Sequence, residues 1–407
     1  MSCESWRPGR ACALWALLAG SLVTPRVHAQ LEDVRIEGVP DYEWHAGCFG
    51  TATGNLMGFW DRNGFPEFYT GPTGGGVAPL NSRASQGNQG IFSLWASKAG
   101  RDGRPANLPG HEDDYYGAYE GVFADPYLTA GRQEHTPDCI GDFIGLSQNK
   151  WADLGGECRG NIDGFSYVHW DRSGARRWAR PGFEPSIPEG SDIVSGLVAW
   201  TRFRGGEASS FCQLTDFNPA VSGGRGFTYA ELKAEIRAGR PVLLFMQPTS
   251  ELSRTLSGVQ GVNPEIHGML AYGYWVADDG TEYVRYRTSW ASGDQMLSPW
   301  TAAPWLPGTL GFPLRGVIGY QPLPRIRAIR REGTEVVLSW DGSTAVVRDG
   351  VAGERRQAQR FLVERAASPD AAAWTIVSDP LEAREFRGPA PAEDGGTFYR
   401  VRSVPAW

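Results

Sequence analysis

The sequence predicts an α+β body followed by a small all-β sandwich, and three observations support this division. A glycine-spaced apolar segment at residues 49–60 predicts a buried helix. Residues 227–290 contain, in succession, the patterns of a capped helix, an apolar strand and a hairpin. From about Leu323 the sequence contains no Lys, and short strand patterns recur as in a β-sandwich. We therefore divide the chain into a body at 30–322 and a sandwich at 323–407.

Composition argues against non-specific nucleic-acid binding and against wholesale disorder. The 407 residues carry 39 Lys+Arg against 46 Asp+Glu, which gives a formal net charge of −7. This acidic balance argues against non-specific nucleic-acid binding, which needs basic surface. The hydrophobic share of 41% is normal for a folded chain, so we expect no wholesale disorder.

The first 29 residues have the pattern of a signal peptide. Arg7 and Arg10 form a basic start, residues 11–23 form a short apolar run, and residues 27–29 end in a small residue before Gln30. The apolar run is too short to cross a bilayer easily. We expect a signal peptide at 1–29, no stable membrane span, and a secreted, periplasmic or cell-surface protein. An uncleaved N-terminal anchor is the alternative.

The helix expected over residues 49–60 carries Gly50, Gly54 and Gly58. Glycines four residues apart form one bare stripe on a helix and permit close backbone packing. Glycine also lowers helix stability, so this helix has to be held by burial. Residues 30–39 predict an entry strand, and residues 62–225 predict loops with short strands and helices.

Clear patterns return at residues 228–231, which form a capping box that opens a helix. Gly239 fits the position just after the end of that helix. The apolar residues 241–246 then predict a buried strand. Residues 266–276 and 282–290 predict two strands of a hairpin.

The cysteines pose the functional question. After removal of the signal peptide, four remain: Cys48, Cys139, Cys158 and Cys212. Four cysteines allow two disulfides, in three possible pairings. If one of them is a working thiolate, the other three form at most one bridge.

Cys48 is the candidate nucleophile, because it follows Gly47 at the start of the glycine-striped helix. A helix N-terminus favours the thiolate form. His267 opens the first hairpin strand and would face Cys48, which is the arrangement of a thiol protease. Thr288 ends the second strand and would approach the far side of His267.

The segment around Cys48 resembles the nucleophile motif of C39-like peptidases in the papain-like superfamily, W-x-x-G-C-x-P-T-x-x-G-M-x-x-G-Y-x-D. The matching residues are Trp44, Gly47, Cys48, Thr51, Gly54, Gly58 and Asp61. The segment HGMLAYGYW resembles the family's histidine strand, and the resemblance covers about residues 38–320. It implies a papain-like cysteine peptidase domain at 30–322.

The resemblance also implies roles for single residues. Cys48 would attack a peptide carbonyl as the thiolate, and its backbone N–H would be one oxyanion donor. His267 would form an ion pair with the thiolate and protonate the leaving amine. The substrates would be peptides or proteins, and such chemistry needs no cofactor and no metal.

Two positions depart from the family pattern. The family has a Gln as the second oxyanion donor where this chain has Glu43, and an ionised carboxylate cannot donate. Losing one such donor costs roughly 3–4 kcal/mol in the transition state. The oxyanion candidates are therefore a protonated Glu43 or the indole of Trp44. The family also has Asn or Asp to orient the histidine where this chain has Thr288, whose hydroxyl orients it less firmly.

The C-terminal region resembles a fibronectin type III module. Trp340 in VVLSWD and Tyr399 in TFYRVRSV occupy the places of that module's buried Trp and Tyr. By analogy, such a module implies adhesion or substrate presentation through a surface ligand.

Three other functions remain open. One is a weak or inactive pseudopeptidase that binds peptides, and another is a cell-surface adhesion protein that acts through the sandwich. A glycan-active enzyme is the third, although no paired-carboxylate motif supports it. His135 and Cys139 make an incomplete metal-ligand set. The acidic cluster at 111–114 is expected to be solvated, with Ca²⁺ binding as the minor option.

Overall fold

In the computed structural model, strands predominate and helices are few. The residues it describes are 31–42, 48–68, 77–82, 140–144, 168–170, 176–178, 193–217, 226–246, 267–290, 293, 295–303, 305, 313–391 and 396–406. The signal-peptide segment 1–29 lies outside these ranges. No helix within them combines the length and the apolar character needed to cross a bilayer.

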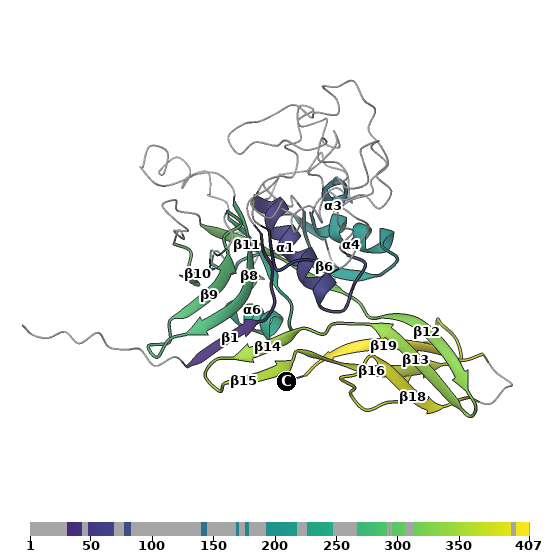
Figure 1. Ribbon diagram of the computed structural model, residues 1–407. Helices are drawn as coiled ribbons and strands as arrows, with labels where there is room; N and C mark the ends of the chain where they lie inside the picture. The colour runs from purple at the N-terminus through teal and green to yellow at the C-terminus, as the bar shows by residue number, and fades with distance from the viewer. Residues whose placement is uncertain are drawn as a thin grey trace, which may run out of the picture.

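One large antiparallel sheet occupies the centre of the molecule (Figure 1). Its strands are β1 (Glu32–Ile36), β4 (Val168–Trp170), β5 (Arg176–Trp178), β6 (Ala208–Leu214), β7 (Val242–Met246), β8 (His267–Val276), β9 (Glu282–Arg287), β10 (Gln295–Pro299), β11 (Leu314–Pro322), β14 (Val346–Asp349) and β15 (Glu354–Gln357). The order is β15-β14-β1-β8-β7-β11-β6-β4-β5, with β9 beside β8 and β10 beside β9. β8 pairs with β7, β1 and β9, so it is the most firmly held strand of the sheet.

Helix α1 (Cys48–Arg62) confirms the predicted glycine-striped helix. Its residues from Phe49 to Asp61 are all buried, which offsets the low helix propensity of its glycines. At Gly58 a Cβ atom would collide with the Tyr42 hydroxyl, so the bare position permits the close approach of a neighbouring strand. That strand is β2 (Asp41–Tyr42), which pairs in parallel with β3 (Asn81–Ser82).

Helix α6 (Tyr229–Arg237) and strand β7 confirm the second set of patterns. Thr228 and Glu231 form both hydrogen bonds of the capping box. Gly239 has a φ of 68°, the left-handed conformation that ends the helix. All five β7 side chains are buried, so the sheet is covered on both faces here.

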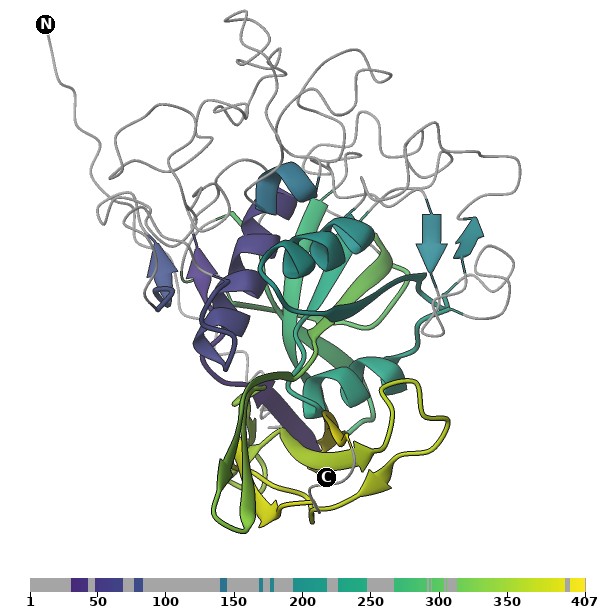
Figure 2. The same cartoon turned by 90° about the vertical axis from the view of Figure 1, so that its right-hand side faces the viewer.

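The described part of the body contains two further helices. α3 (Ile140–Phe143) packs on α4 (Ile193–Phe203), where a Cβ atom at Gly196 would collide with the Phe143 carbonyl. Thr201 of α4 shares a 2.6 Å hydrogen bond with the Tyr320 hydroxyl of β11. Figure 2 shows α1 in purple and α4 in teal beside each other over the sheet, with the C-terminal strands in yellow-green below.

The C-terminal strands form two three-stranded sheets, as the β-sandwich prediction requires. One contains β12 (Arg325–Glu332), β13 (Glu335–Asp341) and β18 (Glu385–Pro389), and the other β17 (Thr375–Ile376), β16 (Gln359–Ala366) and β19 (Phe398–Pro405). Their shared core contains Leu338, Trp340, Phe361 and Val363. Trp340 meets Phe361 edge to face at 5.7 Å, so the predicted buried Trp lies in this core.

The β14–β15 hairpin leaves the sandwich and joins the large sheet through β1. Val347 of β14 lies opposite Ile36 of β1, and both side chains are buried. The main chain of Thr344 also donates to the Asn63 carbonyl at 3.1 Å. Residues 323–407 therefore contribute strands to the body and share its core.

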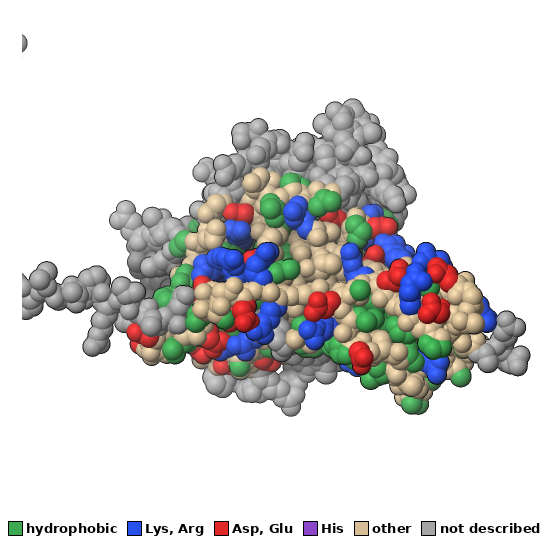
Figure 3. Space-filling view, turned by 60° about the horizontal axis from the view of Figure 1, so that its bottom comes forward, with side chains coloured by type: hydrophobic (Ala, Val, Ile, Leu, Met, Phe, Trp, Pro, Cys, Tyr) green, Lys and Arg blue, Asp and Glu red, His purple; other side chains and the backbone are tan. Residues whose placement is uncertain are grey.

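The face of the C-terminal region shown in Figure 3 carries interspersed Arg and acidic side chains. Many charged side chains of the C-terminal region form ion pairs: Arg355–Glu37, Arg360–Glu382, Arg387–Glu332, Arg387–Glu385, Arg400–Glu364 and Arg402–Glu364. Exposed pairs of this kind contribute little to stability, about 0–1 kcal/mol each. Because positive and negative side chains alternate, the described part of this face carries no patch of a single charge sign.

The close contact at Gly64 gives a stability prediction. Gly64 has a φ of 103°, and a Cβ atom there would collide with the Gly342 carbonyl of the C-terminal region. Gly64→Ala should lower the free energy of unfolding by about 3 kcal/mol or more. Gly280→Ala is the matched control, because Gly280 has a φ of 82° and open space around it. It should lose only about 1–2 kcal/mol. Equal losses in urea unfolding would show that the two regions are not packed this closely.

Candidate active site

Cys48 and His267, 219 positions apart by number, occupy adjoining ends of two elements. Cys48 is the first residue of α1 and His267 the first residue of β8. The main-chain N–H of Gly268 donates a hydrogen bond to Cys48 Sγ at 3.3 Å. The sulfur therefore lies against the backbone next to the histidine.

The residue after Cys48 and the residue after His267 explain how the two elements come together. Phe49 and Gly268 are fully buried against each other, and a Cβ atom at Gly268 would collide with the Phe49 ring. Because position 268 has no side chain, the ring sits directly on the strand. This contact places the first turn of α1 on the first residues of β8.

His267 is oriented by a main-chain carbonyl. Its Nε2 lies 2.8 Å from the oxygen of Thr288, and a carbonyl oxygen only accepts hydrogen bonds. The Nε2 atom therefore carries the hydrogen, and in the neutral ring the lone pair is on Nδ1. Nδ1 is thus the ring atom able to take a proton from a thiol.

The sequence predicts the Thr288 hydroxyl near the imidazole, and the structure brings the main-chain carbonyl of the same residue to the ring. The Thr288 Oγ1 atom accepts a hydrogen bond from the Trp290 main chain at 3.3 Å, while the Thr288 carbonyl lies 2.8 Å from the imidazole Nε2. The sequence pattern identified the position but not the atom. The choice of atom depends on the path of the main chain after β9.

Ser289 and Trp290 fix that path, and the sequence motifs did not assign them a role. Ser289 has a φ of 66°, the left-handed conformation that costs a non-glycine residue about 1–2 kcal/mol. The Trp290 ring stacks on the His267 ring, with centroids 4.4 Å apart and planes at 29°. Strained residues of this kind cluster at functional sites. A Trp two residues beyond Thr288 was the only sequence signal for this arrangement.

Burial makes His267 a weak base in the resting protein. The side chain is 2% exposed, and desolvation lowers the pKa of His267 to about 4, although the Thr288 carbonyl favours the protonated form. The imidazole is therefore neutral at pH 7. The ion pair expected with Cys48 requires the thiolate charge itself to raise the pKa of His267.

The remaining expected site residues lie outside the described ranges, except for the Cys48 main chain. Glu43 and Trp44, the oxyanion candidates, are among the residues that the structure does not describe, as are Cys139, Cys158 and His135. Cys212 is buried in β6. Cys48 begins α1, so its N–H belongs to the first helical turn, which has no intrahelical acceptor. Within the described part of the chain, no three His, Cys, Asp or Glu side chains gather as a metal site would require.

Comparison with known proteins gives no family assignment, because the chain matches no family model and no curated protein. The functional argument therefore rests on the geometry of Cys48 and His267 and on the sequence motifs around them.

The pKa of His267 predicts a loss of stability in acid. Between pH 6.5 and about 4, the unfolded histidine binds a proton that the folded one does not. The free energy of unfolding should therefore fall as pH drops through this window, by up to about 3 kcal/mol. His267→Gln removes the group, so this variant should lose less stability over the same range. Urea unfolding of both proteins at about pH 7 and about pH 4.5 measures the difference, and equal losses would contradict the assignment.

The carbonyl contact predicts that the Thr288 hydroxyl is dispensable for orienting the imidazole. Thr288→Val should keep the Nε2–H tautomer, seen in long-range ¹H–¹⁵N spectra, and alter Cys48 alkylation by no more than about threefold. Ser289→Val is the contrasting variant, because a β-branched residue is strongly disfavoured at positive φ. It should displace the carbonyl and change the tautomer signal. A lost Nε2–H signal in Thr288→Val would return the role to the hydroxyl.

Proposed function

We propose that the chain is an exported cysteine peptidase in which Cys48 and His267 act as a dyad. The observation that carries the proposal is the joint placement of three groups. The Cys48 sulfur lies on the main chain beside His267, and the Nε2 of His267 is tied to the Thr288 carbonyl. A nucleophile, a base and a group that orients the base are the parts such chemistry needs.

The reaction follows from the protonation states. The Cys48 thiol gives its proton to Nδ1 of His267, and the sulfur attacks the carbonyl carbon of a peptide bond. The developing oxyanion is stabilised by the Cys48 N–H at the start of α1. Nδ1–H then protonates the leaving amine, and a thioester remains on Cys48. Water, deprotonated by Nδ1, hydrolyses the thioester and restores the thiol.

The finer family assignment belongs to the same proposal. Cys48 at a helix start and His267 at the start of an antiparallel strand support a papain-like fold. The C39-like motif supports this assignment for residues 30–322. For residues 323–407, a buried Trp340 between two three-stranded sheets supports a fibronectin type III-like module. The signal-peptide pattern at 1–29 supports a secreted, periplasmic or cell-surface location.

A pseudopeptidase is the second candidate, and the burial of His267 favours it. A general base is most effective with a pKa near the working pH, whereas burial holds the pKa of His267 near 4. Glu43, in place of a donor Gln, weakens the oxyanion site further. In this alternative the same site binds peptides and releases them uncut.

Alkylation tests the nucleophile directly. Iodoacetamide at about pH 6 should label Cys48 in the folded protein, because attraction between the thiolate and the protonated His267 ring would stabilise the ion pair. Cys212 is fully buried and is the internal control, which should label only after unfolding. Peptide mass spectrometry locates the label. Labelling of Cys48 no faster than that of a model thiol would refute the dyad.

Substitution tests turnover. Cys48→Ala should lower peptidase activity by at least about 1,000-fold, while Cys212→Ala should leave it near the wild-type level. Rapid labelling of Cys48 with no turnover in the wild type would support the pseudopeptidase. In that event Glu43→Gln should restore cutting, because it supplies the missing donor.

A further inference from the structure

Asp41 binds the chain on both sides of the residues that orient His267. Its carboxylate accepts hydrogen bonds from Arg287 Nη1 at 3.2 Å and from the main-chain N–H of Gly293. Residues 288–290, which lie between these two donors in the sequence, contain the carbonyl and the ring that contact His267. We call the arrangement of Asp41, Arg287 and Gly293 the Asp41 clamp.

The Arg287 guanidinium contacts three other segments of the chain. Nη1 binds Asp41, Nη2 donates to the Val39 carbonyl at 3.2 Å, and the group lies 4.8 Å from the centroid of the Tyr272 ring. Tyr272 belongs to β8, and its hydroxyl donates to Gln295 of β10 at 3.0 Å. A guanidinium over an aromatic ring is attracted to the ring face. The Arg287 side chain therefore ties the end of β9 to β2 on one side and to β8 on the other.

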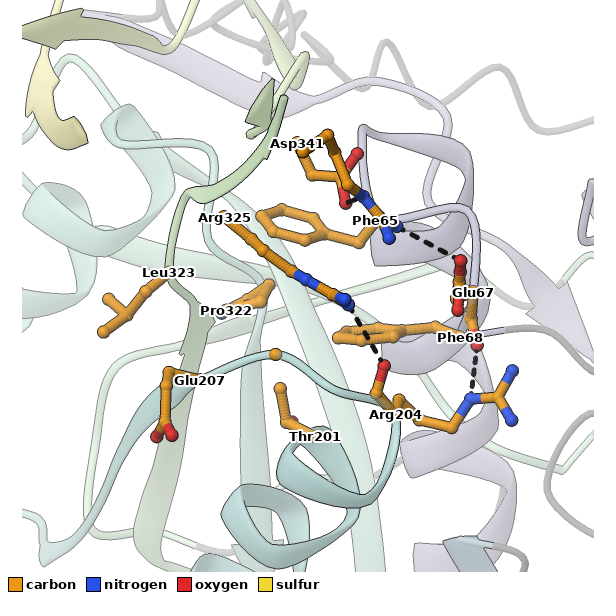
Figure 4. Close-up of a pocket in the computed structure, with 12 residues that line it drawn as sticks. Phe65, Glu67, Phe68, Thr201, Arg204, Glu207, Pro322, Leu323, Arg325 and Asp341 are labelled. Atoms are coloured by element: carbon orange, nitrogen blue, oxygen red, sulfur yellow. Dashed lines mark hydrogen bonds and ion pairs between the residues drawn. The ribbon is translucent and has the colours of Figure 1, made fainter. Parts of the chain in front are cut away.

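The ion pair between Asp41 and Arg287 is shielded from water, because the two side chains are 14% and 13% exposed. A contrasting case is Arg327, which binds Glu67 and Asp341 where the residues after α1 meet β13 (Figure 4). The Arg327 and Glu67 side chains are 31% and 46% exposed. Water screens exposed charges, whereas a shielded pair keeps its attraction and its geometry. The Asp41 pair is therefore better suited to hold the neighbouring main chain in position.

The strand that carries Asp41 is itself fixed on the helix of the nucleophile. The main-chain N–H of Tyr42 donates to Asn55 Oδ1 at 2.9 Å, and both residues are fully buried. The Tyr42 hydroxyl occupies the space that a Cβ atom at Gly58 would need. Asn55 and Gly58 belong to α1, whose first residue is Cys48. Asp41 therefore connects the end of β9 to the helix that carries the sulfur.

We propose that Asp41 is a positioning residue that directs the Thr288 carbonyl at His267. It acts through Arg287 and Gly293, and so through the main chain, rather than on the reacting atoms. Its role in catalysis rests on the proposed dyad, but its effect on the imidazole can be measured without turnover.

The strain at Ser289 supports this role. Ser289 has a φ of 66°, in the left-handed region. A non-glycine residue keeps such a conformation where the surrounding structure holds it. Asp41 binds the chain before Ser289, at Arg287, and after it, at Gly293. Without the clamp this segment should relax, and the Thr288 carbonyl should turn away from the ring.

Hydrogen exchange at the His267 ring, measured by NMR on the full chain, tests the proposal. In Asp41→Ala the Nε2–H proton should exchange with water at least about 10-fold faster, because the imidazole loses its fixed acceptor. Asp33→Ala is the matched control, since Asp33 binds Arg285 of the same strand at 3.2 Å and its side chain is 17% exposed. Asp33 lies opposite Trp275, toward the other end of β8 from His267. This control should leave the exchange rate unchanged.

Two conservative variants separate positioning from general destabilisation. Asp41→Asn keeps an oxygen that can accept from Gly293 but loses the ion pair, so its exchange rate should lie between those of the wild type and Asp41→Ala. Arg287→Lys keeps the charge without the fork and should also be intermediate. Asp41→Asn provides the test if Asp41→Ala does not fold, as urea unfolding will show. Wild-type exchange in a folded Asp41→Ala or Asp41→Asn protein, or an equal increase in Asp33→Ala, would overturn the proposal.

Alkylation of Cys48 distinguishes failure of the clamp from failure of the dyad. Iodoacetamide labelling at about pH 6 should be at least about 10-fold slower in Asp41→Ala than in the wild type, and unchanged in Asp33→Ala. Equally fast labelling of the wild type and a folded Asp41→Ala protein would overturn the clamp and leave the dyad in place. Slow labelling of the wild type, together with faster His267 exchange in Asp41→Ala, would refute the dyad and support the clamp.

Discussion

The packing of the Phe49 ring on Gly268 is the contact on which the candidate active site depends. Any side chain at position 268 would occupy the space of the ring, and the first turn of α1 would have to move off β8. Gly268 is paired with Phe245 of β7, and β9 and β1 pair with β8 farther along, so the strand has little freedom to adjust. The position of Cys48 is therefore fixed by the buried core of the sheet. Catalytic groups held in this way can be placed more accurately than groups on loops.

The orientation of the His267 ring depends on main-chain geometry. The burial of the ring lowers its pKa and so weakens it as a base. A carbonyl acceptor fixes the tautomer but brings no negative charge, so it stabilises imidazolium less than a carboxylate would. The neutral ring is a poor base until charge appears on the sulfur. Attraction between thiolate and imidazolium is strong in a poorly solvated site. The transfer of the proton from Cys48 to His267 therefore creates both charges together, and each charge stabilises the other. Under the proposed function, the same geometry would serve a slow peptidase or a peptide-binding protein, depending on how well the oxyanion is stabilised.

Local patterns in the sequence predicted the elements that depend on local forces. The capping box at Thr228, the buried strand after it and the hairpin that begins near His267 follow from neighbouring residues, and they are present. The β14–β15 hairpin was not predicted as part of the body, because its pairing with β1 joins residues more than 300 positions apart. The role of the Thr288 carbonyl as the acceptor for the His267 ring was not predicted, for a different reason. Its direction is set by one left-handed residue, Ser289, which carries no glycine signal.

The contacts between the body and the C-terminal region indicate that this region has a fixed position on the body and does not hang from a flexible linker. Gly239 ends α6 in a left-handed conformation, and a Cβ atom there would collide with Ala345 and Ala358, so one glycine serves both the helix end and the contact between regions. The Gln359 amide donates to the Ala238 carbonyl at 2.9 Å from a buried position. Removing the sandwich would expose these groups, so the C-terminal region belongs to the same folded unit as the body.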